Sequence, residues 1–136
     1  MELLRKAVKP EYRYQIRHFA VNHFPRSVIR ICDSKFGVFF PDYFDEQKTI
    51  FVHVPKSAGT SIADALYGRT INHLSAAYYQ KANPDKFNNY YSFAVVRNPL
   101  ERLVSAYLYA KRGGTEKVPI SNPEIYQISE FSDFHT

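Results

Sequence analysis

The stretch TIFVHVPKSAGTS, residues 49–61, decides the fold. The run 50–54 is apolar and mostly β-branched or aromatic, a composition that predicts a short buried strand. Pro55 ends the strand because it has no N–H group to donate to a neighbouring strand. Thr60 and Ser61 then offer hydroxyl groups that can cap a helix. The stretch therefore predicts a strand, a short loop and a helix in direct succession.

The loop between this strand and this helix has the features of a phosphate-binding loop. Free N–H groups at a helix start bind anions, and Lys56 adds a full positive charge beside them. Gly59 has no side chain, so a ligand can approach the backbone closely there. The residue order excludes the Walker A motif, in which the lysine follows the glycine. The alternative is an ordinary strand–turn–helix corner with Lys56 in solvent.

A second stretch, residues 90–111, repeats this layout. Its apolar run 92–96 predicts another short strand. Asn98 is a good N-cap, Pro99 suits the first helical position, and Glu101 completes a capping box. The apolar side chains that follow recur at helical spacing and predict one buried helix face, formed by Leu100, Leu103, Val104, Tyr107 and Leu108.

Two strand–helix units joined by a helical crossover predict an α/β fold, in which a parallel sheet is flanked by helices. Ligands bind such sheets at the carboxyl ends of the strands, and Lys56 and Arg97 each follow a strand closely. Ser105 lies off the apolar face of the second helix and could present its hydroxyl to the same ligand. The sequence thus predicts one ligand site at this edge of the sheet.

Composition narrows the function classes. With 136 residues and no linker-like run, we expect a single domain over residues 1–136. The formal net charge of +5 favours an anionic partner, but the basic residues are scattered, which disfavours nucleic-acid binding. The single cysteine, Cys32, excludes an internal disulfide and a thiolate metal site, and we expect no metal. We expect no transmembrane segment and no signal peptide, and therefore a cytoplasmic location.

The first 48 residues form an aromatic and basic lead-in. Apolar residues at helical spacing predict one helix over residues 12–23. The runs 28–31 and 38–40 are expected to be short strands or packing segments, with no chemistry of their own.

Short helices are predicted between the two informative stretches. Residues 62–66 supply one apolar helix face, and Gly68 is the expected end of that helix. Ser75 can cap a further helix over 76–80, which a turn at 83–85 ends.

Together, VPKSAGTS at 54–61 and VRNPLERLVSAY at 96–107 resemble the signature pair of the sulfotransferases. The closest resemblance is to the membrane-associated carbohydrate (Golgi-type) branch and its bacterial relatives, and it covers residues 49–110. It implies a P-loop-like nucleotide-binding fold and 3′-phosphoadenosine 5′-phosphosulfate (PAPS) as the sulfuryl donor, without a metal. It also implies a hydroxyl acceptor, carried by a carbohydrate.

The resemblance assigns a role to each residue that matches the motifs. The first motif would hold the 5′-phosphosulfate through a run of six residues, which are Lys56, Ser57, Ala58, Gly59, Thr60 and Ser61. The second would hold the 3′-phosphate through Arg97 and Ser105, which are eight residues apart. Lys56 would neutralise charge on the departing phosphate, and Arg97 has the planar fork that suits a terminal phosphate.

The acceptor hydroxyl needs a base, and we expect this base to be His73. An imidazole titrates near neutrality, and related carbohydrate sulfotransferases carry a histidine followed by a serine-containing segment at this place. The alternative is a loop histidine without a catalytic role. His53, in the first strand, is expected to be structural.

Catalytic domains of this family normally continue well beyond the second motif, so we expect the fold to be incomplete at the C-terminus. Residues 49–112 would form the PAPS-binding core and 113–136 a partial acceptor-side segment. Three functions stay open: a PAPS-dependent sulfotransferase, a catalytically incomplete module that binds PAPS or its product, and a P-loop kinase-like phosphotransferase. The last is disfavoured because the Gly-Lys-Ser/Thr order is missing. A second copy or a partner chain could complete the site.

Overall fold

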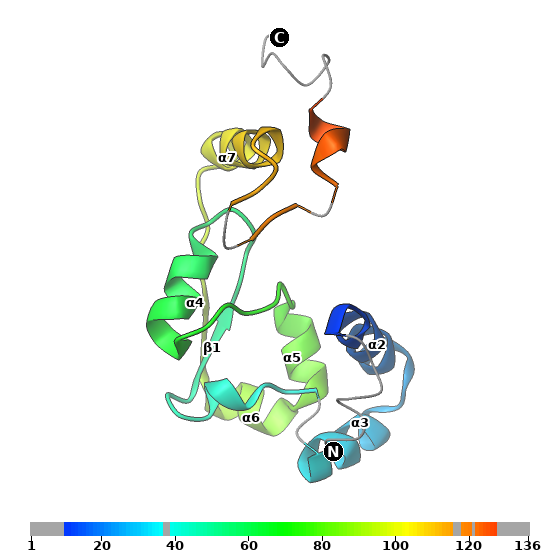
Figure 1. Ribbon diagram of the computed structural model, residues 1–136. Helices are drawn as coiled ribbons and strands as arrows, with labels where there is room; N and C mark the ends of the chain where they lie inside the picture. The colour runs from blue at the N-terminus through cyan, green and yellow to red at the C-terminus, as the bar shows by residue number, and fades with distance from the viewer. Residues whose placement is uncertain (1–9, 37–38, 116–117, 121, 128–136) are drawn as a thin grey trace. The chain divides into compact units, whose positions relative to one another are not determined.

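The computed structural model describes most of the chain (Figure 1). The described residues are 10–36, 39–115, 118–120 and 122–127. The end of the predicted acceptor-side segment, 128–136, and Val38 of the predicted 38–40 run lie outside them. The described residues form two compact units: the loop Pro55–Ala58 belongs with the chain from Val96 onward, and the remainder forms the first unit. The single domain expected over the whole chain stays a prediction.

The first unit contains a parallel two-stranded sheet. β1 (Thr49–Val52) pairs with β2 (Tyr91–Ala94), and the first residues of the two strands lie opposite each other. The two central residues of β1 are fully buried, as expected for an apolar run of this composition. The prediction of an α/β fold with a parallel sheet flanked by helices is confirmed.

The helices of the first unit include the three that the sequence predicts. With one 3-10 turn among them, they are α2 (Pro10–His23), α3 (Arg26–Phe36), η1 (Asp42–Phe44), α4 (Gly59–Tyr67), α5 (Ala76–Ala82) and α6 (Pro84–Asn89). α2 confirms the helix predicted over 12–23, and α4 ends directly before Gly68, as expected. Ser75 caps α5 as predicted, because its hydroxyl accepts the Tyr78 N–H at 3.1 Å.

One prediction for the connecting segments is wrong and another is incomplete. The strand alternative for residues 28–31 is wrong, because this segment lies within α3, where the buried positions Ile29 and Asp33 are four residues apart. The turn expected at Asn83 does end α5, but it also begins α6. The Asn83 side chain accepts the Lys86 N–H at 3.1 Å and so caps the next helix at once.

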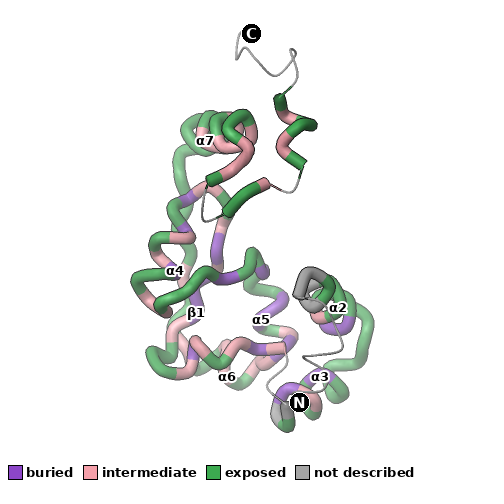
Figure 2. Tube along the Cα trace, in the orientation of Figure 1, coloured by how far each residue is buried: buried purple, intermediate pink, exposed green. Residues whose placement is uncertain are grey.

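Aromatic rings form much of the core of the first unit. Phe40, Phe44 and Tyr79 are buried and contact one another edge to face, with ring centroids 5.7, 6.0 and 5.3 Å apart. Val21 of α2 and Ile29 of α3 belong to the same buried cluster, which Figure 2 shows as purple segments of the tube. Burial of these large apolar side chains is the main source of stability in this unit.

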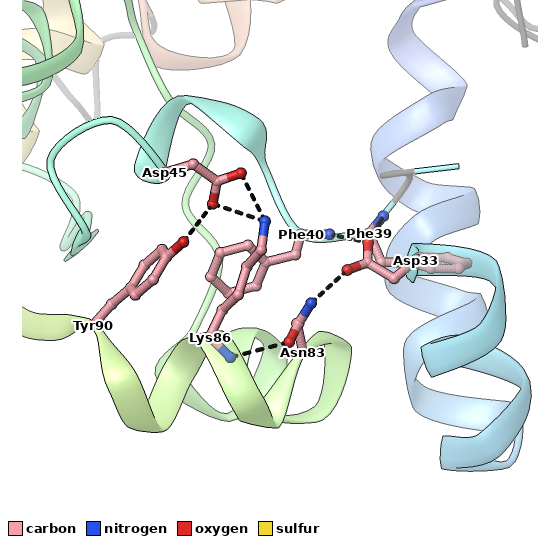
Figure 3. A network of polar contacts seen from close by, with 7 residues as sticks. All are labelled: Asp33, Phe39, Phe40, Asp45, Asn83, Lys86 and Tyr90. Atoms are coloured by element: carbon pink, nitrogen blue, oxygen red, sulfur yellow. Dashed lines mark hydrogen bonds and ion pairs between the residues drawn. The ribbon is translucent and has the colours of Figure 1, made fainter. Parts of the chain in front are cut away.

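A buried carboxylate connects α3 to the segments around it (Figure 3). Asp33 accepts the backbone N–H groups of Phe39 and Phe40 at 2.9 and 2.8 Å. Its second oxygen accepts the Asn83 side-chain amide at 2.9 Å. Asp33 therefore fixes the chain that follows α3 and the junction between α5 and α6 at the same time.

A second carboxylate in Figure 3 holds α6 against the segment after η1. Both oxygens of Asp45 accept from the Lys86 ammonium at 2.7 Å, and one of them also accepts the Tyr90 hydroxyl at 2.9 Å. Burial, with the Asp45 contact as the second cause, raises the pKa of Tyr90, so this hydroxyl remains a donor over the whole neutral range.

The second unit is built on α7 (Pro99–Lys111), followed by η2 (Pro123–Tyr126). Asn98 caps α7 as predicted, because its side chain accepts the Leu100 N–H at 3.0 Å. The predicted capping box is not closed, since the Glu101 carboxylate contacts the Arg97 side chain instead. After the helix, Gly114 has a φ of 101° and forms a β-bridge with Pro119, so the chain turns back immediately.

The buried face predicted for α7 is wrong. Leu100 and Leu103 are 73% and 55% exposed, Val104 and Leu108 are also exposed, and no residue of this helix is buried. Figure 2 accordingly shows α7 in green and pink only. The apolar spacing identifies a stripe on the helix, but it does not specify which segment covers that stripe.

Candidate functional site

The loop Pro55–Ala58 has a strained backbone. Lys56 and Ala58 have φ values of 63° and 59°, whereas Ser57 between them does not have a positive φ. Such left-handed conformations cost a non-glycine residue about 1–2 kcal/mol each, and they cluster at ligand sites. Alternation of left- and right-handed residues turns successive N–H groups towards one side and forms an anion-binding nest. Lys56 and Ala58 supply the left-handed positions that such an anion cradle requires.

The Lys56 ammonium lies over the Tyr109 ring, 3.8 Å from the ring centroid. Lys56 is half-buried, so the alternative of a lysine in open solvent does not describe this side chain. Desolvation lowers the pKa of Lys56, and the positive charge of Arg97 lowers it further. A bound anion would relieve the repulsion between these two cations.

Arg97 is held by a carboxylate four residues further along α7. Its Nε donates to a Glu101 oxygen at 3.0 Å, and both side chains are largely exposed. The two terminal nitrogens of Arg97 have no hydrogen-bond partner among the described residues. The contact thus leaves the outer edge of the guanidinium available for a bidentate ligand.

One face of α7 carries the contacts to the loop. Arg102 donates from Nε to the Pro55 carbonyl oxygen at 3.0 Å, and Tyr109 contacts Lys56. Because Ser105 is three residues after Arg102 and four before Tyr109, helix geometry places it on this same face. Ser105 is half-buried there. The sequence predicts a site role for Ser105, which stays a prediction, and it does not indicate Arg102 or Tyr109, since no local pattern points to their contacts.

Ser57, at the centre of the loop, is 3% exposed. Its hydroxyl oxygen is buried and has no hydrogen-bond partner among the described residues. A buried hydroxyl without a partner is costly, and a ligand oxygen would satisfy it.

In the first unit, α4 begins at Gly59, so Thr60 and Ser61 lie in its first turn. The prediction that one of these two hydroxyl residues is the N-cap is therefore wrong, because the helix begins two to three residues earlier than that cap requires. Their N–H groups belong to the first turn, where no intrahelical acceptor exists. These groups can donate to an anion in the way that the sequence predicts.

Gly59 is fixed by a neighbouring ring. A Cβ atom at this position would lie 1.8 Å from His53 Cδ2 and 2.1 Å from His53 Nε2. The imidazole of His53 fills the space that a side chain would need, so packing alone requires glycine here. Close approach of a ligand, the reason expected from sequence, is not needed to explain the residue.

His53 and His73 form a pair in the first unit. Their ring centroids are 4.1 Å apart, and His73 Nδ1 lies 3.3 Å from the His53 carbonyl oxygen. A carbonyl only accepts, so this contact places the proton on Nδ1 of His73 and leaves Nε2 as the basic nitrogen. His73 is exposed, as an acceptor base must be.

The environment of His53 is different. It is only 7% exposed, and its Nδ1 has no hydrogen-bond partner among the described residues. Burial lowers the pKa of His53, and the charge of His73 lowers it further. The His53 ring is therefore held neutral and packs against Gly59, while its backbone carbonyl orients His73.

The predicted site residues divide between the two units. Five of them belong to the second unit, namely Lys56, Ser57, Ala58, Arg97 and Ser105. The other four belong to the first unit, namely Gly59, Thr60, Ser61 and His73.

Two features are absent from the part of the chain that the structure describes. No three or more histidine, cysteine, aspartate or glutamate side chains gather there in a way that could hold a metal ion. No helix in this part of the chain combines the length and the apolarity needed to cross a membrane.

Comparison with known proteins gives one match. The model of the sulfotransferase family matches residues 42–125, a range that contains every predicted site residue. Neither the curated proteins nor the solved structures contain a match to this chain.

Proposed function

This chain belongs to the sulfotransferase family, and from that premise we propose that it transfers a sulfuryl group from PAPS to a carbohydrate hydroxyl. The observation that carries the proposal is the pairing of a strained loop with two neighbouring cations. Lys56 has a left-handed backbone in that loop, and its pKa is lowered first by desolvation and then by the charge of Arg97. An anion with two separate charged groups would be stabilised by both.

The residues of the first motif fit the 5′-phosphosulfate of the donor. The N–H groups of Lys56, Ser57 and Ala58 would supply donors, and the Ser57 hydroxyl would supply one more. Thr60 and Ser61, in the first unit, have first-turn N–H groups that are further candidate donors. When bound, the donor supplies the sulfuryl group that the acceptor receives. Lys56 would hold its positive charge at the 5′-phosphate, where negative charge increases during transfer.

The residues of the second motif fit the 3′-phosphate. Arg97 would bind two phosphate oxygens through its terminal nitrogens, while Glu101 keeps the Nε side occupied. Ser105 would donate its hydroxyl from the helix face that meets the loop. These contacts would distinguish the donor from nucleotides without a 3′-phosphate.

His73 would act as the base for the acceptor hydroxyl. The His53 carbonyl keeps the proton on Nδ1 of His73, so Nε2 can accept the proton of the attacking hydroxyl. An exposed imidazole with a free Nε2 suits this role.

The experiment is a thermal-shift comparison, followed by a transfer assay. We expect 3′-phosphoadenosine 5′-phosphate (PAP), the donor's product, to raise the melting temperature more than ATP or AMP at equal concentration. Preference for ATP would contradict the proposal and favour a phosphotransferase. Transfer of a labelled sulfuryl group from PAPS to a panel of sugars, compared with transfer to phenols, tests the acceptor class. His73→Ala should abolish this transfer without lowering the affinity for PAP.

A further inference from the structure

We propose that Tyr109 is a positioning residue for Lys56, whose ammonium it holds over the phosphate-binding loop. The role rests on the proposed function, because it requires that Lys56 bind the donor's 5′-phosphate. No motif includes Tyr109, which is four residues beyond Ser105 on the same face of α7.

The contact has the geometry of a strong cation–π interaction. The Lys56 Nζ atom is 3.8 Å from the centroid of the Tyr109 ring, well inside the range of about 6 Å over which such contacts act. Lys56 and Tyr109 are both half-buried, so the attraction is less screened than on an open surface. The contact limits where the flexible lysine side chain can place its charge.

The ring itself is fixed from its far end. The Tyr109 hydroxyl donates to the Val118 carbonyl oxygen at 2.7 Å. That carbonyl belongs to the tight turn after α7, where Thr115 N–H donates to Val118 and Ile120 N–H donates to the Gly113 carbonyl, both at 3.0 Å. Tyr109 is therefore anchored both through the helix backbone and through its hydroxyl.

A ring is better suited than a carboxylate to position this lysine. Among the described residues Lys56 has no ion pair, whereas Arg97 is paired with Glu101. A carboxylate would neutralise the lysine and occupy its N–H groups. The face of a ring attracts the cation from one side and leaves the three N–H donors available for phosphate oxygens.

The backbone of Lys56 is held to the same helix. Arg102 donates to the Pro55 carbonyl, one residue before Lys56, at 3.0 Å. Loop and side chain are thus attached to α7 at two positions, Arg102 and Tyr109, which are seven residues or two helical turns apart. This arrangement prepares Lys56 for binding before the ligand arrives, which reduces the entropy that binding must remove.

The test compares Tyr109→Leu with Tyr109→Phe. Both variants lose the hydroxyl bond to Val118, but only the leucine variant loses the ring. In the free protein, the ε-methylene protons of Lys56, assigned with Lys56→Arg, should show an upfield ring-current shift in the parent and in Tyr109→Phe. The shift should be absent in Tyr109→Leu. Absence of the shift in the parent would overturn the inference whatever the protein binds.

Ligand affinity gives the second measurement. We expect Tyr109→Leu to lower the affinity for PAP about 5- to 30-fold, and we expect the affinity of Tyr109→Phe to stay within about 3-fold of that of the parent. In a Lys56→Ala background, Tyr109→Leu should change PAP affinity by less than about 2-fold, because the group that it positions is gone. A purely structural role for Tyr109 would give the same loss in both backgrounds.

The outcomes separate the inference from the proposed function. A parent that binds PAP while Tyr109→Leu and Tyr109→Phe bind it equally well overturns the positioning role alone. A parent that does not bind PAP overturns the proposed function, and the positioning role with it, even where the ring-current shift is present. If Tyr109→Leu does not fold, Tyr109→Met, another variant without a ring, takes its place in every comparison.

Discussion

Replacing Ala58 by glycine should stabilise this chain. Ala58 has a φ of 59°, a conformation that costs a residue with a Cβ about 1–2 kcal/mol and costs glycine almost nothing. Glycine also gives the unfolded chain more freedom, which offsets about 0.4–1 kcal/mol of this gain. The net expectation is a free energy of unfolding that rises by about 0.5–1 kcal/mol.

Ala106→Gly is the matched control, because it makes the same chemical change at an ordinary position within α7. There glycine should lower the free energy of unfolding by about 1 kcal/mol. Urea unfolding at one pH measures both variants, with the slope of each transition checked for constancy. If Ala58→Gly is as destabilising as Ala106→Gly, the left-handed loop and the anion cradle built on it are refuted. We also expect Ala58→Gly to bind PAP less tightly than the parent, since a more flexible loop is less prepared for the ligand.

Three further predictions concern single residues. Asp33→Ala should lower the free energy of unfolding by about 3–5 kcal/mol, because two backbone N–H groups and one side-chain amide lose a charged acceptor. Asp85→Ala is the control in the same urea titration: it breaks an exposed ion pair and should lower the free energy of unfolding by less than about 1 kcal/mol. Because the pKa of His53 is lowered in the folded chain, the unfolded chain binds more protons than the folded chain below the ordinary pKa of 6.5. The contribution of His53 to stability is therefore present above that pH and is lost as the pH falls towards the folded pKa. His53→Phe should flatten the pH dependence of the melting temperature. Lys56→Ala should reduce sulfuryl transfer at least ~100-fold without changing the circular dichroism spectrum, and turnover within a few-fold of the parent would exclude its role at the departing phosphate.

The features that could be predicted from sequence are local ones. Asn98 and Ser75 were identifiable as caps because each side chain bonds to its own backbone two or three residues away. The strands β1 and β2 were identifiable because each is a short apolar run before a proline-containing corner. In these places the physical cause lies within a few residues of its effect.

The features that could not be predicted depend on partners far along the chain. Tyr109 contacts Lys56 although the two residues are 53 positions apart in the sequence, and no spacing rule connects them. Gly59 suggested a ligand approach, whereas the ring of His53 supplies the actual constraint. The apolar stripe of α7 was visible, but its exposure depends on which segments pack against the helix.

The backbone of the phosphate-binding loop was also beyond sequence reasoning. Lysine and alanine have no preference for the left-handed region, so the pattern of residues at Lys56 and Ala58 does not indicate it. The surrounding structure imposes this conformation against local preference, which is typical of functional loops.

The most direct test of the central claim is the affinity of Arg97→Ala for PAP and for AMP, measured by calorimetry. Loss of a charge-assisted contact worth about 1.5–3 kcal/mol should lower the affinity for PAP about 10- to 150-fold. The affinity for AMP should stay within about 3-fold of that of the parent, because only PAP carries the 3′-phosphate. Arg102→Ala is the control, since it releases the loop at Pro55 and should weaken both nucleotides alike. Equal weakening of PAP and AMP by Arg97→Ala would contradict the assignment of this residue to the 3′-phosphate.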